Sequence, residues 1–273
     1  TFTGLVWPTE KGFKRRLLML TDKITCACST HLIPEGEGVK SDLLNNGITK
    51  KPIKVLGYGN VKGVDMVRFS KRPEVMAAAA ELRDEKRFTF VFVGRIVKDK
   101  GINELCEAFE QLNNKYPRTR LFLVGKYENN IDPISKKSQE IIENAPAIQA
   151  VGPKYNDELL SYYAAADCFV FPSYREGFPN PVMEAGAMDL PSIVTDINGA
   201  REIIIEGENG TIIPPKDKNA LYSSMERMVV DSLWRETMAS NARRMIMDRF
   251  EKSFVQKCLL NYYYEILNPQ KYD

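Results

Sequence analysis

The sequence predicts an α/β protein built around a doubly wound parallel sheet. From Phe88 onward, short apolar runs alternate with helical segments with few interruptions. One of these runs, Cys168 to Phe171, has the unbroken apolar character of a strand buried on both faces, and Pro172 ends it because proline cannot donate to a ladder. Right-handed crossovers between parallel strands leave helices on both faces of the sheet. Ligands of such sheets bind at the carboxyl ends of the strands.

Strands and helices follow each other in strict order through this part of the chain. We predict strands at residues 88–93, 120–124, 148–151, 168–171, 192–195 and 211–213. The intervening and following helices are predicted at residues 102–113, 135–143, 157–166, 181–188, 200–206 and 219–229. Outside the alternation, helices are predicted at residues 74–83, where four successive alanines favour helix, and at 232–249 and 252–266.

The first 70 residues contain too few elements to close a core unaided. We predict a basic helix at residues 11–21, short strands at 31–34 and 53–56, and a helix at 38–46 that Gly47 ends. A unit of this size buries too little apolar surface to be stable alone. Residues 57–70, with Gly57, Gly59 and Gly63, are interpreted as a connection. We therefore divide the chain into residues 1–70, 71–250 and 251–273.

The basic helix allows two interpretations. Lys11, Lys14, Arg15 and Arg16 precede an apolar run that starts at Leu17. Such a helix can lie on an anionic membrane surface, or its charges can form an ordinary solvated face. The sequence has no secretory signal and no apolar run of the roughly 18 residues that a membrane span requires. We expect a cytoplasmic protein, with peripheral contact at the inner face of the cell membrane as the open question.

Composition excludes several classes of protein. The 273 residues carry 38 basic and 36 acidic side chains, a net charge of +2, which gives no reason to expect nucleic acid as a partner. The 5 cysteines are irregularly spaced and are interpreted as reduced core residues, not as a disulfide framework or a zinc site. The only histidine, His31, has no matching metal-ligand set. Because the sequence lacks an initiator methionine, we expect it to be part of a longer chain.

Two carboxylates flank the turn that follows the strand at 168–171. Glu176 lies in the loop, and Glu184 lies eight residues later in a helix for which Asn180 is the predicted N-cap and Pro181 the first residue. Free amides at that helix N-terminus suit an anion, and carboxylates accept hydrogen bonds from sugar and ribose hydroxyls. From the spacing alone, an equally good interpretation is that Glu176 is solvated and Glu184 merely favours the helix N-terminus.

The same stretch resembles a known family. The run Glu-Gly-Phe-Pro-Asn-Pro-Val-Met-Glu-Ala, preceded by Ala-Ala-Asp-Cys-Phe-Val-Phe-Pro-Ser, is similar to the Glu-x7-Glu signature of retaining glycosyltransferases of family 4, which have the GT-B fold. The resemblance implies that residues 71–250 are the Rossmann-like donor domain. It makes residues 1–70 the end of a partial N-terminal acceptor domain with its linker, and residues 251–273 a helix that crosses back to that domain. The glycine-rich loop and catalytic histidine with which the family's acceptor domain begins are absent here, and His31 is not assigned that role.

The resemblance also implies which residues bind the donor. The motif Gly-Arg-x4-Lys-Gly follows the first strand and matches the family's diphosphate-binding positions, which are Arg95 and Lys100 here. From the residues alone, Arg95 and Lys100 could equally be two solvated charges. Glu176 is implied to bind the donor sugar and Glu184 the ribose. The remaining donor-binding residues implied by the match are Gly94, Gly125, Pro153, Lys154, Leu159, Gly177, Phe178, Pro179 and Asn180.

The function implied is transfer of a hexose from a nucleoside-diphosphate sugar, with UDP favoured over GDP. Arg95, Lys100 and Glu176 are the predicted catalytic residues. The acceptor is expected to be a saccharide or a lipid-linked saccharide of a cell-surface glycan such as capsule or lipopolysaccharide. No cofactor or metal ion is expected, since no Asp-x-Asp motif is placed to hold one. The alternatives are a GT-B epimerase or phosphorylase, and a nucleotide-sugar-binding module without transferase activity.

Overall fold

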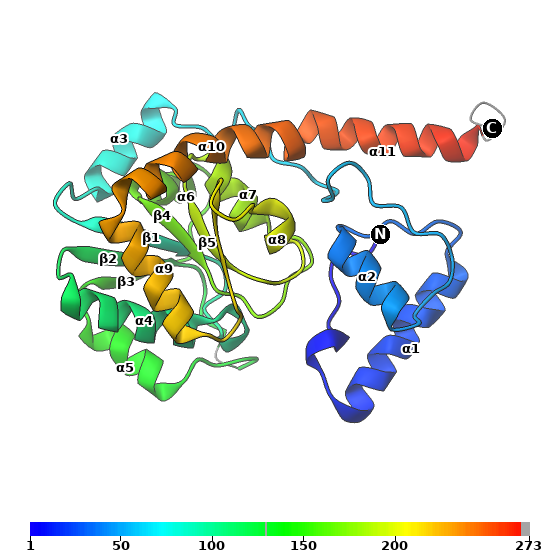
Figure 1. Ribbon diagram of the computed structural model, residues 1–273, viewed down its shortest axis with the longest axis horizontal. Coiled ribbons are helices and arrows are strands. Elements are labelled where there is room, and N and C mark those ends of the chain that lie inside the picture. The colour runs from blue at the N-terminus through cyan, green and yellow to red at the C-terminus, as the bar shows by residue number, and fades with distance from the viewer. Residues whose placement is uncertain (129, 269–273) are drawn as a thin grey trace.

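The computed structural model describes residues 1–128 and 130–268 and confirms the predicted α/β fold. Six parallel strands form one sheet in the order β3-β2-β1-β4-β5-β6 (Figure 1). This order, with helices on both faces, is that of a Rossmann-like doubly wound sheet. The strands are β1 (Phe88–Val93), β2 (Thr119–Val124), β3 (Ile148–Gly152), β4 (Cys168–Phe171), β5 (Ser192–Thr195) and β6 (Gly210–Ile213). Every residue of β4 is buried, as its unbroken apolar run predicts.

Two groups of helices cover this sheet. The helix α4 packs between α5 and α9 on one face, while α3 packs on α6, and α10 on α7, on the other (Figure 1). Their bounds are α3 (Pro73–Leu82), α4 (Ile102–Lys115), α5 (Lys136–Asn144), α6 (Asn156–Ala165), α7 (Asn180–Ala187), α8 (Ala200–Ile203), α9 (Lys218–Val230), α10 (Ser232–Phe250) and α11 (Lys252–Leu267). None of the helices among the described residues combines the length and the apolar character that crossing a bilayer requires.

The N-terminal segment, residues 1–63, has its own small apolar cluster. It contains a 3-10 turn (Trp7–Thr9), α1 (Gly12–Cys28) and α2 (Glu37–Asn45), and Gly47 follows α2 with a φ of 62°. The two predicted short strands are wrong. Residues 2, 32, 34 and 53 form only two isolated parallel bridges, Phe2 with Pro34 and Leu32 with Ile53, and no ladder follows from either. The main apolar core begins at Val64 and continues to Phe250.

One predicted helix is too long. The segment expected to be helical at residues 200–206 leaves the helix after Ile203. The side chain of Asn209 accepts a hydrogen bond from Ile205 N at 2.8 Å and donates one to the carbonyl of Ile203 at 3.2 Å. Glu206 then forms a bridge with Gly210. These contacts satisfy the backbone in place of another helical turn.

Side chains of the main domain hold the N-terminal segment in place. The carboxylate of Glu202 accepts hydrogen bonds from the first amides of α2, at Glu37 (2.7 Å) and Gly38 (3.1 Å). Beside it, Asn198 Nδ2 donates to Asp42 Oδ2 at 2.7 Å. Because a carboxylate at a helix N-terminus satisfies free amides and complements the helix dipole, this contact orients α2 toward the main domain.

The last helix, α11, extends from the main domain toward the N-terminal segment (Figure 1). Glu265 forms an ion pair with Lys54, and the ring of Tyr262 meets that of His31 edge-on with centroids 6.2 Å apart. The final residues of the predicted 251–273 segment, 269–273, lie outside the described residues. The contacts of Glu265 and Tyr262 join α11 to the N-terminal segment.

Candidate functional site

The candidate site lies where two neighbouring strands send their connections in opposite directions. Strands β1 and β4 pair directly, although β1 leads toward β2 and β4 leads toward β5. This is the switch point at which open α/β sheets bind ligands. The loops after β1 and β4 are joined to each other, since Tyr174 N donates to Asp99 O at 2.9 Å and Arg175 pairs with Asp99 at 2.8 Å.

The loop after β1 places Lys100 next to the end of β4. A 3-10 turn (Lys98–Lys100) precedes Gly101, which has a φ of 70° and starts α4. A Cβ atom at Gly101 would lie 2.1 Å from the carbonyl oxygen of Pro172, so only glycine lets the two loops approach this closely. The Lys100 ammonium consequently lies 5.5 Å from the ring centroid of Phe171.

Lys100 and Glu176 form the central ion pair of the site. Their side chains are 14% and 16% exposed, respectively. Ser173 Oγ donates a second hydrogen bond to the same Glu176 oxygen at 2.9 Å. A pair so shielded from water interacts more strongly than a surface pair, and each partner orients the other. The sequence predicted both residues for the site but did not predict that they touch.

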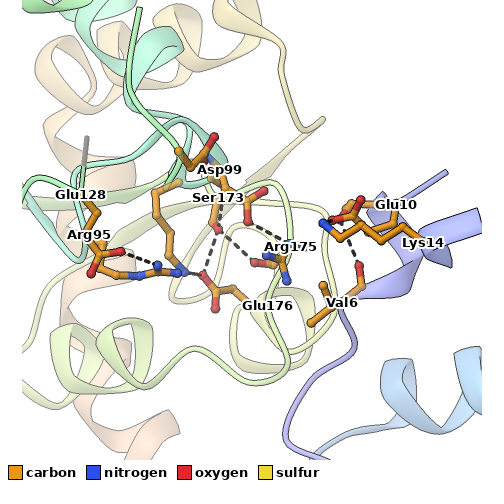
Figure 2. A network of polar contacts seen from close by, with 12 residues as sticks. Val6, Glu10, Lys14, Arg95, Asp99, Glu128, Ser173, Arg175 and Glu176 are labelled. Atoms are coloured by element: carbon orange, nitrogen blue, oxygen red, sulfur yellow. Dashed lines mark hydrogen bonds and ion pairs between the residues drawn. The ribbon is translucent and has the colours of Figure 1, made fainter. Parts of the chain in front are cut away.

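Arg95 is also ion-paired, but in a more open position. Its Nη1 atom lies 2.8 Å from Glu128 Oε2, and its side chain is 49% exposed (Figure 2). Surface pairs of this kind contribute little to stability. The guanidinium is therefore able to exchange Glu128 for an incoming anion at small cost.

A cavity of about 250 Å³ brings these residues together. Arg95, Lys100, Glu176 and Gly177 line it from the main domain. The facing wall comes from the N-terminal segment, residues 3–6, which were not predicted to belong to the site. The remaining wall is formed by Asp99 and Arg175. The lining thus combines three cations with two carboxylates, and such a set can bind an anion that is linked to a polyhydroxylated group.

The N-terminal segment reaches the site because Gly177 has no side chain. A Cβ atom at Gly177 would lie 1.8 Å from the carbonyl oxygen of Thr3 and 2.8 Å from Gly4 Cα. The two backbones therefore touch, and any larger residue would separate them. The glycine pair at positions 4 and 177 is the only signal for this contact in the sequence, and it cannot be recognised without the fold.

Several predicted donor-binding residues lie outside this cavity. Gly125 touches the backbone of Gly94, since a Cβ atom there would lie 1.8 Å from the Gly94 carbonyl oxygen. Lys154 pairs with Glu158 at 2.5 Å, and Leu159 packs against the main core. Pro153 belongs to the loop between β3 and α6 that also contains Lys154. Gly125, Pro153 and Lys154 thus belong to the loops after β2 and β3 at the same edge of the sheet, and Leu159 to α6.

The start of α7 differs from the prediction at Asn180. Pro179 occupies the N-cap position, and Asn180 is the first helical residue, so its side chain does not cap the helix. The Pro179 carbonyl accepts from Val182 N at 3.2 Å, and the Asn180 side chain instead accepts a hydrogen bond from Asn60 Nδ2 at 3.5 Å. Phe178 is buried against Phe250, with ring centroids 5.4 Å apart.

Glu184 lies one helical turn further and does not line the cavity. The hydroxyl of Tyr163 donates to its Oε2 atom at 3.2 Å. Burial raises the pKa of Glu184, and this hydrogen bond opposes the shift. The other carboxylate oxygen has no side-chain partner among the described residues, and it is available to accept from a hydroxyl.

No metal-ligand cluster and no disulfide bond occurs among the described residues. Among residues 1–128 and 130–268, no group of three or more histidine, cysteine, aspartate or glutamate side chains is arranged to bind a metal ion. The described cysteines are free thiols, and Cys26, Cys106 and Cys168 are buried. Cys28 is exposed, so its prediction as a core residue is wrong, because it lies on the opposite side of the end of α1 from Cys26.

Comparisons with known proteins match the chain to glycosyltransferases. The family model described as "Glycosyl transferases group 1" matches residues 77–245. The capsular polysaccharide biosynthesis glycosyltransferase CapM of Staphylococcus aureus is 31% identical over 272 residues, which cover 99% of this chain and 71% of CapM. The putative teichuronic acid biosynthesis glycosyltransferase TuaC of Bacillus subtilis is 30% identical over 63% of this chain, which spans 41% of TuaC.

Solved structures share the fold. Anabaena HepE in complex with UDP-glucose superimposes with a TM-score of 0.81 at 19% identity, covering 96% of this chain and 71% of HepE. WaaG, a glycosyltransferase involved in lipopolysaccharide biosynthesis, gives a TM-score of 0.73 at 20% identity, covering 92% of this chain and 69% of WaaG. The Rossmann-like sheet is thus that of the GT-B glycosyltransferases. The family match over most of the chain and the likeness to CapM over nearly all of it show that this chain belongs to the group 1 glycosyltransferases.

Proposed function

We propose that the chain contains the donor site of a retaining hexosyltransferase that uses a nucleoside-diphosphate sugar, with UDP favoured over GDP. The observation that carries the proposal is the single cavity lined by Arg95, Lys100 and Glu176 at the switch point of the sheet. The complex of HepE, a structural relative, with UDP-glucose supports the choice of donor. The names of CapM and TuaC, which refer to capsular polysaccharide and teichuronic acid, support a saccharide or lipid-linked acceptor in cell-surface polysaccharide synthesis.

Each charged residue of the site has one role in the proposed mechanism. Arg95 and Lys100 bind the diphosphate and stabilise the negative charge that develops as its bond to the sugar breaks. Glu176 accepts hydrogen bonds from the sugar hydroxyls, and Glu184 accepts from the ribose. The acceptor hydroxyl attacks the sugar carbon on the face that the diphosphate leaves, which retains the configuration, and its proton passes to the departing diphosphate oxygen. Because the two cations neutralise the leaving group, the proposal includes no metal ion or other cofactor.

Ligand-induced stabilisation tests the choice of donor. A ligand that binds only the folded protein raises the melting temperature by mass action. In a panel of UDP, GDP, ADP and their common sugars, we expect UDP and one UDP-sugar to give the largest increase. A larger increase with GDP or ADP would overturn the choice of base, and no increase with any nucleotide would contradict a donor site. Release of free nucleotide without acceptor would instead favour a hydrolytic or epimerase activity.

Peripheral membrane contact is proposed for α1. Along one side of this helix, Phe13, Leu17, Leu20 and Ile24 are 80%, 49%, 53% and 55% exposed, at the spacing of a continuous helical stripe. The same helix and its N-cap carry several exposed lysine and arginine side chains, including those at positions 11, 16 and 23. An apolar stripe flanked by cations fits an anionic bilayer surface.

Vesicle sedimentation tests this contact. We expect binding to phosphatidylglycerol vesicles and little binding to phosphatidylcholine vesicles, because the cations contribute electrostatic attraction. The double variant Phe13→Ser/Leu17→Ser should lose most of this binding, whereas Leu233→Ser, which changes a leucine that is 77% exposed on α10, should not. Equal binding by both variants would rule out the stripe as the contact.

A further inference from the structure

A second and larger cleft adjoins the cavity of Lys100. It has a volume of about 590 Å³ and lies between the N-terminal segment and the loops after β1, β2, β4 and β6. Val6, Arg95, Asp99 and Arg175 line both spaces, which therefore lie next to each other. If the inner cavity holds the donor sugar, as proposed above, an acceptor must reach it through adjoining space. A role for this cleft in acceptor binding therefore rests on the proposed function.

Most charges that line this cleft are neutralised by partners within the protein. Lys14 pairs with Glu10 at 2.7 Å and Arg175 with Asp99 at 2.8 Å. The carboxylate of Asp132 accepts from Asp99 N at 2.6 Å and so fixes the loop after β1. Figure 2 shows the Glu10–Lys14 pair on the side of the cleft that faces Arg175. Glu10 and Asp99 are thus paired with cations, whereas the carboxylate of Asp132 is hydrogen-bonded to a backbone amide.

Two lysines that line the cleft differ from Lys14 and Arg175 because they have no carboxylate partner among the described residues. Lys98 and Lys216 come from the loops after β1 and β6, and both side chains are exposed. Within residues 1–128 and 130–268, neither forms an ion pair with a carboxylate. The cleft therefore contains two lysines without an ion-pair partner, on the loops after β1 and β6 that line it, and such charges attract an anionic group.

The position of Lys216 is held by local structure. Its φ is 63°, a left-handed value that is unfavourable for lysine and that tends to occur at functional sites. Its ammonium lies 4.7 Å from the ring centroid of Tyr174. The Tyr174 hydroxyl in turn donates to Glu104 at 2.6 Å, so the ring is fixed from both ends. Lys216 is therefore directed along the cleft over a flat aromatic surface.

The cleft also offers apolar surface for a sugar ring. Tyr174 is half-buried, and Ile131 and Val6 on the rim are 75% and 43% exposed. Aromatic and aliphatic surface beside charged groups is typical of sites that orient a ligand by a few polar contacts. A neutral glycan would leave both lysines unused, whereas a glycan with a carboxylate would use surface and charge together.

We infer that Lys98 and Lys216 bind the carboxylate of an acidic sugar in the acceptor, so that the enzyme selects uronic-acid-containing saccharides. The lysines position the acceptor and take no part in bond breaking. Their contribution is an electrostatic contact of moderate strength, since both side chains are exposed. A charge-assisted hydrogen bond to each lysine is expected to improve binding of the acidic acceptor about fivefold to tenfold.

Calorimetry on the full-length protein with bound UDP tests this inference. The probes are an oligosaccharide that ends in glucuronic acid and its carboxyl-reduced counterpart, which differ only in the charged group. We expect the acidic probe to bind about tenfold more tightly, and added salt to reduce the difference. In Lys98→Gln/Lys216→Gln the difference should disappear. It should persist in Lys136→Gln, which changes an exposed lysine of α5 outside the cleft.

The outcomes separate this inference from the proposed donor site. Equal binding of the two probes by the wild type, or an unchanged preference in the double variant, would overturn the inference. A preference for a neutral glycan on a prenyl diphosphate, lost in the double variant, would overturn it too and assign the lysines to the lipid carrier. UDP binding reports on the donor site separately, and we expect the double variant to retain it, because Arg95 and Lys100 are unchanged.

Discussion

Replacing Lys100 with alanine is expected to reduce sugar transfer by the full-length protein about a hundredfold or more. Loss of a fixed group that stabilises developing charge has effects of this size. The change also removes the partner of Glu176, which is only 16% exposed and would be left with the hydroxyl of Ser173. We therefore expect kcat to fall more than the donor KM rises, as measured by steady-state transfer from a UDP-sugar.

The control for this prediction is a variant that changes an exposed lysine outside the cavity. Lys136→Gln should leave kcat and KM unchanged, because Lys136 is exposed on α5. Lys100→Arg keeps the positive charge but replaces the compact ammonium with a planar guanidinium. Intermediate activity of this variant would show that the position of the charged group matters as well as its charge. Transfer by Lys100→Ala within about threefold of the wild type would remove Lys100 from the proposed mechanism.

Gly177→Ala is expected to be the most damaging small substitution in the site. The added Cβ atom would lie 1.8 Å from the Thr3 carbonyl oxygen, so the N-terminal segment must move away from Glu176. A displacement of about 1 Å at a reacting centre can cost about a hundredfold in rate. We expect transfer to fall by that order while UDP still raises the melting temperature, because Arg95 and Lys100 belong to the main domain.

A glycine with free space around it provides the comparison. A Cβ atom added at Gly207 would meet nothing within 4 Å, although the φ of this residue is 77°. Gly207→Ala should therefore lower stability modestly through backbone strain and leave the rate of transfer unchanged. Equal activity of Gly177→Ala and Gly207→Ala would contradict a role for contact between residues 3 and 177.

The main domain could be predicted because its strands, apart from the edge strand β3, are buried on both faces. Such strands appear in the sequence as continuous apolar runs, of which Cys168 to Phe171 is the clearest. The segment at residues 31–34 was wrongly predicted as a strand because isolated bridges and a short ladder have the same local sequence pattern. The end of α8 was missed because the side chain of Asn209, a tertiary contact, satisfies the backbone there.

The candidate site could be predicted in part for a related reason. Arg95, Lys100 and Glu176 follow strands that are neighbours in the sheet, so the fold alone brings them to one edge. Their partners, such as Glu128 for Arg95, depend on side-chain directions that sequence spacing does not determine. The contribution of residues 3–6 depends on how two parts of the chain meet, and a local pattern contains no information about that.

Calorimetric titration with UDP tests the central claim most directly, namely that Arg95 and Lys100 together hold a nucleoside diphosphate beside Glu176. The wild type should bind UDP with an affinity that weakens as salt is added, since the contacts are between charges. Arg95→Ala/Lys100→Ala should bind at least about a hundredfold more weakly, because two charge-assisted contacts are lost. Wild-type affinity for UDP in that double variant would contradict the account.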